Sequence, residues 1–146
     1  MSLPTWAPDV GQVGVYIPGR TLSIPLGEHL GTFDPTTRPT DDWVAQIIDD
    51  ACGWVTLKTG TIHSSLEGAA RSCAAIRAAA AVELGWPDRN ADVDTAQQLH
   101  EQAARLRDDL HEANLALTGA DPTDPSGAVP VLYGFPAAPA WGDLNI

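Results

Sequence analysis

The sequence predicts an all-α protein, a small helical bundle with a long N-terminal loop or hairpin and an extended C-terminal arm. Apolar residues recur at three- and four-residue steps over 41–54 and 92–119, and an alanine-rich stretch lies between them over 65–84. Prolines and glycines gather before and after these stretches. The 146 residues suit a single core. We therefore expect one helical domain over 1–119 and an arm over 120–146.

The first forty residues combine many prolines and glycines with only short apolar patterns. Pro8 and Asp9 can open a short helix that runs to Tyr16, which Gly11 and Gly14 weaken. Over 17–39 the pattern breaks into turn residues with short alternating stretches, which predicts a long loop or hairpin. A loop of that length in a small domain commonly serves a function.

Two helices are expected after this loop. Thr40 is a good N-cap, and an apolar stripe predicts an amphipathic helix that continues to about Trp54. Ser64 and Glu67 match the S-x-x-E capping box, which predicts a second helix over 65–84 that stops at Gly85. Its many alanines would let other helices approach closely, so we expect it to be central.

The clearest helical period lies in the last helix, which we expect to begin near Asp92 and to stop at Gly119. Its stripe either packs on its own domain or forms a face between subunits, and the length of the helix is compatible with some of both. The stripe consists of Leu99, Ala103, Leu106, Leu110, Ala113 and Leu117.

The segment 120–146 has five prolines and neither lysine nor arginine, yet it carries several large apolar residues. The prolines disfavour a helix, and a fully solvated tail seldom has so many apolar groups. We interpret it as an extended arm that docks on another surface, with folding back over its own core as the alternative. The apolar residues are Val129, Val131, Leu132, Tyr133, Phe135 and Trp141.

The chain is strongly acidic, with a formal net charge of -11 from 8 basic and 19 acidic residues. Its basic residues form no cluster beyond Arg105 with Arg107, which disfavours specific binding of nucleic acid. Such a charge usually reflects a solvated surface, and less often the lining of a channel through which DNA passes without adhering. The candidates for an acidic lumen are Asp41, Asp42, Asp49, Asp50, Asp108 and Asp109.

The motifs of common enzymes and metal sites are incomplete or missing. His100-Glu101 and His111-Glu112 resemble the start of the HExxH zinc motif, but Ala104 and Leu115 occupy the positions of the second histidine. The sequence has no nucleophile elbow and no phosphate-binding glycine loop. We therefore expect no catalytic residues, no metal and no cofactor.

The cysteines and the N-terminus bear on the compartment. Cys52 and Cys73 lie among apolar neighbours in helical patterns, as reduced core thiols do, which favours a cytoplasmic origin. The first ten residues have neither the basic start nor the apolar stretch of a signal peptide. The longest apolar run is too short to span a bilayer, and no membrane partner is expected.

Three stretches together resemble the head-to-tail adaptors of long-tailed actinobacteriophages. They are Leu3-Pro4-Thr5-Trp6-Ala7-Pro8, Gly31-Thr32-Phe33 through Thr37-Arg38-Pro39-Thr40 into a helix, and the alanine-rich helix from Arg71 to Trp86. The likeness covers about the first 118 residues in order. The loop over 17–39 departs from the shorter or more polar loops of that family.

The resemblance implies a structural virion protein of the neck, assembled in the host cytoplasm. Such adaptors form a homo-oligomeric ring, usually a dodecamer, beneath the portal of the DNA-filled head. They offer their other face to the next connector, a head-completion or stopper protein, and DNA passes through without specific binding. The resemblance also implies a C-terminal segment that reaches the portal, which matches 129–135 here, and it carries no catalytic residues.

The residues alone are also compatible with a function of another class. The chain could be a cytoplasmic helical regulatory module that captures one partner protein through the face from Leu99 to Leu117. Stoichiometry separates the two hypotheses, because an adaptor closes into rings whereas a regulator forms small complexes.

Overall fold

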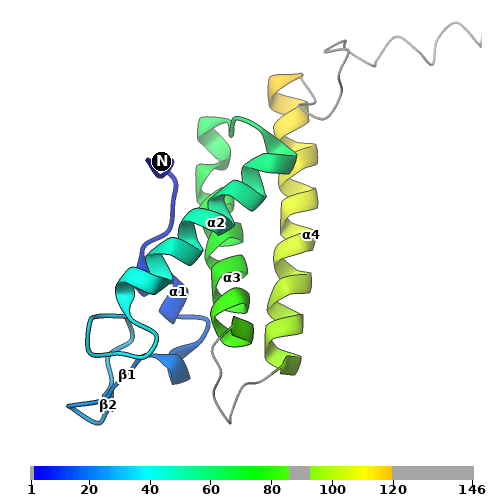
Figure 1. Cartoon of the computed structure of the whole chain (residues 1–146). Coiled ribbons are helices and arrows are strands. Elements are labelled where there is room, and N and C mark those ends of the chain that lie inside the picture. The colour runs from blue at the N-terminus through cyan, green and yellow to red at the C-terminus, as the bar shows by residue number, and fades with distance from the viewer. Residues whose placement is uncertain (1, 86–92, 120–146) are drawn as a thin grey trace, which may run out of the picture.

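The computed structural model describes residues 2–85 and 93–119, and it confirms the predicted helical bundle. Three long helices form the bundle, and a short helix and a two-stranded hairpin precede them (Figure 1). The elements are α1 (Val10–Gly14), β1 (Leu22–Ser23), β2 (Glu28–His29), α2 (Asp41–Thr59), α3 (Glu67–Gly85) and α4 (Val93–Thr118), with 3₁₀ helices at Pro18–Arg20 and Ser64–Leu66. The strands pair antiparallel, with Leu22 opposite His29.

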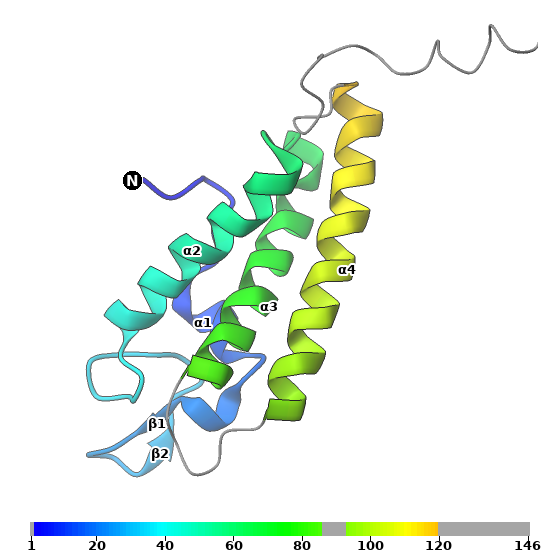
Figure 2. The same cartoon turned by 45° about the vertical axis from the view of Figure 1, so that its right-hand side comes forward.

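The three long helices are not equally close to one another along their lengths. α3 and α4 run antiparallel side by side, whereas α2 leans across α3 and diverges from α4 toward its own N-terminus (Figures 1 and 2). The hairpin, the end of α3 and the start of α4 lie at one end of the bundle. The end of α4 at Gly119 lies at the opposite end.

The alanine-rich helix α3 is the centre of the bundle, as predicted. Its buried alanines occupy several faces, and Ala70, Ala74 and Ala78 have no exposed surface. Small side chains allow helix backbones to approach closely. The thiol of Cys73 accordingly lies 3.4 Å from the carbonyl oxygen of Ala103 on α4.

Helix α2 extends beyond its predicted end at Trp54, to Thr59. Val55 and Thr59 continue the buried stripe, so the apolar period supports another turn. Gly60 then ends the helix with a positive φ of 67°, a conformation that glycine adopts without steric cost. Thr40 is the N-cap residue, although its side chain makes no capping hydrogen bond.

The predicted capping box of Ser64 with Glu67 is wrong. Residues Ser64–Leu66 form a 3₁₀ turn that the ring of His63 caps, by accepting from the amide of Ser65 at 3.2 Å. α3 starts only at Glu67, whose carboxylate instead accepts from the hydroxyl of Thr5 at 3.4 Å. The predicted pair is thus replaced by a local cap from His63 and by a bond between Glu67 and the distant Thr5.

A buried asparagine of α4 holds the turn between α2 and α3. The side-chain amide of Asn114 donates to the carbonyls of Thr59 at 3.0 Å and Thr61 at 2.9 Å. Its oxygen accepts from the amide of His63 at 2.9 Å. The NH2 group and the oxygen of this buried amide therefore both have hydrogen-bond partners. The turn is therefore fixed from α4.

Two local motifs order the N-terminal region. Asp9 caps α1, and Gln12 returns a bond to the amide of Asp9, each at 2.8 Å, which makes a capping box. Before α2, the carboxylate of Asp34 accepts from the hydroxyl of Thr36 at 2.6 Å and from two backbone amides. The hydrogen bond from the Thr36 hydroxyl is the main cause that lowers the pKa of Asp34.

A buried ion pair ties the hairpin region to α3. The guanidinium of Arg20 donates two bonds to the carboxylate of Glu83, Nε to Oε2 at 2.9 Å and Nη2 to Oε1 at 2.7 Å. The two side chains are only 9% and 8% exposed. This bidentate geometry is the strongest that an arginine and a carboxylate can form. It joins residues 63 positions apart.

Leu110 and Leu117 provide a matched test of the α4 packing. Leu110→Ala is expected to lower the free energy of unfolding by about 2–5 kcal/mol, because the side chain is 2% exposed and a cavity would remain. Leu117→Ala, on the same helix but 51% exposed, is expected to change it by less than about 0.5 kcal/mol. Urea denaturation measures both, and equal losses would contradict the packing of α4.

The ion pair predicts a second effect on stability. Glu83→Gln is expected to cost about 3–5 kcal/mol, because it removes the negative charge that faces the buried guanidinium of Arg20. The double variant Arg20→Met with Glu83→Leu should recover most of that loss. Glu112→Gln, at an exposed position of α4, is the control. A loss below about 1 kcal/mol for Glu83→Gln would mean that the pair does not anchor the N-terminal region.

Candidate interaction surface

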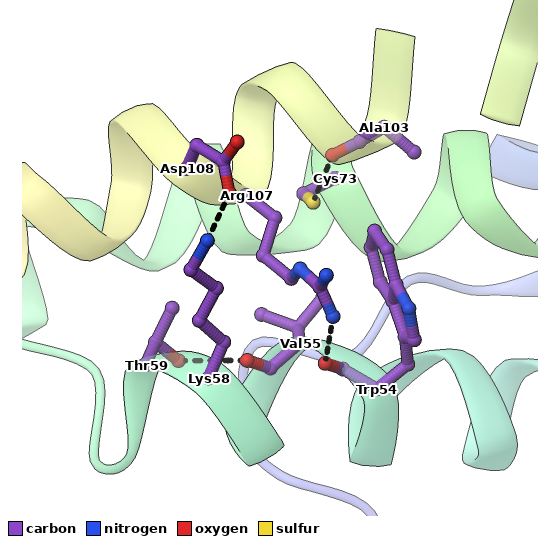
Figure 3. A network of polar contacts seen from close by, with 8 residues as sticks. All are labelled: Trp54, Val55, Lys58, Thr59, Cys73, Ala103, Arg107 and Asp108. Carbon is purple, nitrogen blue, oxygen red and sulfur yellow. Dashed lines mark hydrogen bonds and ion pairs between the residues drawn. The ribbon is translucent and has the colours of Figure 1, made fainter. Parts of the chain in front are cut away.

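An aromatic residue of α2 is stacked by arginines from the two other long helices. The guanidinium of Arg107 on α4 lies 3.7 Å from the centre of the Trp54 ring, and that of Arg77 on α3 lies 5.0 Å away. Arg107 also donates to the carbonyl of Trp54 at 3.2 Å, and Figure 3 shows this hydrogen bond and the indole ring beside the guanidinium. Cation–π attraction at such distances stabilises the position of both partners.

His100 extends this cluster toward the start of α4. Its Nδ1 lies 2.6 Å from Nη1 of Arg77, and its ring centre lies 6.2 Å from that of Trp54. An arginine can only donate, so Nδ1 of His100 must accept. In the neutral ring the proton then resides on Nε2, which leaves that nitrogen as a donor.

Below this cluster, a groove opens between α3 and α4 where α2 has diverged. It encloses about 630 Å³. Its apolar wall includes Ala81 and Leu84 from α3 and Val93 from α4, and Arg77 and His100 lie among its polar lining residues. Leu84 is 66% and Val93 58% exposed. The groove thus joins an apolar surface to a pair of hydrogen-bond donors.

The tip of the hairpin carries a second exposed apolar surface. Ile24 and Leu26 are each 64% exposed, and Leu22 is 37% exposed. Arg20 and Glu83 anchor the hairpin to α3, so these side chains are presented on an ordered support. Several exposed large apolar groups together are typical of surfaces that contact other proteins.

The six acidic residues expected to line a lumen are spread over different parts of the surface. Asp49 and Asp50 of α2 border a shallow surface beside Leu3, whereas Asp108 pairs with Lys58 at the seam of α2 and α4 (Figure 3). The hydrogen bond from Lys58 is the main cause that lowers the pKa of Asp108. Asp41 and Asp42 lie at the start of α2, and Asp109 is exposed on α4. An acidic lumen stays a prediction.

The stripe of α4 divides into an inner and an outer part. Leu99, Ala103 and Leu110 are buried in the chain's own core, and Leu106 packs against that core. Ala113 is partly buried, and Leu117 is exposed. Packing on its own domain therefore accounts for most of the stripe, because a second subunit cannot reach side chains that are already covered. Leu117 leaves part of this face exposed, and capture of a regulatory partner through it stays a prediction.

The arm residues lie outside the described residues. These are Val129, Val131, Leu132, Tyr133, Phe135 and Trp141. Their docking on a portal or another partner remains a prediction. The chain passes out of the described part at Gly119, at the end of the bundle opposite to the hairpin (Figures 1 and 2).

The described ranges, 2–85 and 93–119, hold no group of three or more histidine, cysteine or acidic side chains that could bind a metal ion. Of the four histidines, His29 donates from Nδ1 to the carbonyl oxygen of Pro18 at 3.1 Å, and the ring of His63 caps a turn. Cys52 and Cys73 are free and buried, as predicted. Burial is the main cause that raises the pKa of each thiol to about 11, which makes both poor nucleophiles at neutral pH.

Trp54, Arg77 and Asn114 were not singled out from the sequence as members of a site. A tryptophan near the end of an amphipathic helix and an arginine in an alanine-rich one are the available signals. Neither signal identifies its partner, because the contacts join three different helices.

Comparison with known proteins adds no relative. A scan against models of protein families finds no match, and neither a search of curated proteins nor a search of solved structures finds one. Separately, no helix in the described part of the chain combines the length and apolar character needed to cross a membrane.

The buried thiols predict slow alkylation of the folded protein. A rise in pKa from 9.0 to about 11 lowers the thiolate fraction at pH 8 by about 100-fold, and burial also blocks access. Iodoacetamide at pH 8 should therefore label Cys52 and Cys73 far more slowly in the native protein than in urea, as mass spectrometry can measure. Equal rates in the two conditions would contradict their place in the core.

Proposed function

We propose that this protein is a structural subunit of a tailed bacteriophage, a ring-forming head-to-tail adaptor. It joins the portal to the next connector or stopper protein and allows DNA to pass. The resemblance of its first 118 or so residues to such adaptors suggests this assignment. The observation that carries it is the placement of exposed apolar side chains at both ends of an ordered helical bundle.

An adaptor has to contact different proteins above and below it. At one end of the bundle Ile24 and Leu26 stand exposed on the hairpin, and at the other end Leu117 is exposed near the end of α4. Full burial of a fully exposed side chain of this size gains roughly 1.5–3 kcal/mol. Because these three are 64%, 64% and 51% exposed, each would gain roughly half to two thirds of that amount. Surfaces of this kind support axial contacts with two partners, and the hairpin is our candidate for one of them.

The charge of the chain supports the passage of DNA. With 19 acidic and 8 basic residues the subunit repels a polyanion, and a ring of such subunits would concentrate that field in its channel. Three of the basic side chains, Arg20, Lys58 and Arg107, are engaged by Glu83, Asp108 and Trp54. Phosphate contacts are thereby further reduced.

The hairpin provides the test of this function. The full chain and the variant Ile24→Asp with Leu26→Asp would each be mixed with portal rings, and in a second sample with the next connector protein, and imaged as particles. Wild type is expected to form a ring on the portal, whereas the variant should melt at the same temperature but lose attachment to the portal or to the next connector. The reason is that two charges would have to be buried in the contact.

Gln46→Glu with Gln98→Glu is the charge-matched control, since it adds two negative charges at exposed polar positions of α2 and α4. It should assemble as wild type does. A wild-type chain that forms no ring with or without the portal would overturn the adaptor function. A hairpin variant that binds both partners with full affinity would overturn the role of the hairpin alone.

A further inference from the structure

The groove between α3 and α4 lacks a partner among the described residues where the bundle has room for one. α2 covers the other two helices near Trp54 but diverges from α4 toward the hairpin end (Figures 1 and 2). Leu84 and Val93 are left 66% and 58% exposed at the same place. A further segment laid there would bury both side chains.

We infer that this groove binds residues 129–133 of a second copy of the same chain. The inference rests on the proposed function, because it assigns the contact that joins neighbouring subunits of the ring. A contact in which the arm of one copy enters the groove of the next is heterologous, and repetition of such a contact closes a ring when the rotation allows.

The length and apolar pattern of the segment match the groove. On α4 the lining runs from Val93 to His100, about 10 Å at 1.5 Å per residue. An extended stretch from Val129 to Tyr133 spans about 13 Å. Its alternate residues Val129, Val131 and Tyr133 would face one side, toward the apolar wall.

The polar end of the groove suits the charge of the arm. Arg77 lies among the lining residues, and His100 has its Nε2 hydrogen free of the bond to Arg77. The segment 120–146 has no lysine or arginine, and Asp121 and Asp124 precede its apolar part. Carbonyl or carboxylate oxygens of such a segment can accept from these donors without a competing cation.

The arm is long enough for this contact. From Gly119 to Val129 there are ten residues, which span up to about 33–36 Å when extended. The helical rise from Thr118 back to His100 is about 27 Å. The arm can thus span the length of α4 from its end to the level of the groove, and the groove of a neighbouring subunit is within reach if it lies no farther away than that.

The arm is expected to bind the groove of a second copy more favourably than the groove of its own chain. To reach its own groove, the segment would run back along the exposed face of α4, which is net negative although Arg105 lies among its acids Glu101, Asp109 and Glu112. Asp121 and Asp124 would be brought toward like charges on that path. A neighbouring subunit offers the same groove without that passage.

The test uses two full-length variants, one with substitutions in the groove and one with substitutions in the arm. The groove variant is Leu84→Asp with Val93→Asp, and the arm variant is Val131→Asp with Tyr133→Asp. Wild type is expected to self-associate as its concentration rises. For each variant alone, the dissociation constant of self-association should be at least about tenfold higher, because apolar contacts that the complex would bury are lost. An equimolar mixture should form one-to-one pairs, because each pair still has one intact arm and one intact groove. Native mass spectrometry resolves these species.

Matched controls separate this contact from a general effect of charge. Val15→Asp with Leu57→Asp places two acids on exposed apolar positions outside the groove, and Ala137→Asp with Ala138→Asp places them elsewhere in the arm. Both should self-associate as wild type does. A mixture of the groove and arm variants that stays monomeric, or a single variant that assembles normally, overturns the inference.

Binding of the portal distinguishes this inference from the proposed function. An arm variant that forms rings normally but no longer attaches to the portal would assign the arm to the portal, which overturns the docking and leaves the adaptor function standing. Chains that pair through arm and groove but never attach to a portal would support the docking and overturn the adaptor function.

Discussion

The close approach of two helices to α3 is the constraint on which the rest of this structure depends. Ala70, Ala74 and Ala78 are fully covered, and the thiol of Cys73 lies 3.4 Å from a backbone oxygen of α4. Alanine permits this proximity but brings little apolar area to the core. The larger apolar groups therefore come from the helices on either side, among them Ile48 of α2 and Leu110 of α4. A larger residue in place of these alanines would force the helices apart, since packed interiors have little spare volume.

A core of small residues gives few large contacts that could hold the connecting segments in place. Buried polar groups fill that role here. Asn114 fixes the turn between α2 and α3 from α4, and Glu83 fixes Arg20 from the end of α3. A buried ion pair adds little to stability compared with an apolar pair of the same shape, but the loss of one partner is costly. We therefore regard these bonds as selecting one position for the loop and the turn, which keeps the hairpin in place.

The sequence predicted those parts of the fold that depend on local periodicity. The stripe through Ile47 and Ile48 places α2, and the alternation of Leu99, Ala103 and Leu106 places α4 to within a residue of its observed bounds. It misplaced the start of α3, because Ser64 and Glu67 match a capping pattern that the contacts of Asn114 and Thr5 displace. The candidate surface was predicted least well, since Trp54, Arg77 and His100 come from three helices. The helical period of apolar residues identified the stripe of α4. It could not decide whether that stripe packs on its own domain or forms a face between subunits.

The direction of α2 determines which surfaces remain for other molecules. A helix parallel to α3 and α4 along its whole length would have covered both of them and closed the groove. α2 instead follows α3 toward Gly85, where the Trp43 ring lies 3.6 Å from the position that a side chain of Gly85 would take. This inclination brings the N-terminus of α2 to the hairpin and leaves Leu84 and Val93 exposed beside Arg77. The same geometry thus supports the hairpin and opens the groove. For a subunit that must bind along the axis of a ring and also to its neighbours, one inclined helix supplies both kinds of surface.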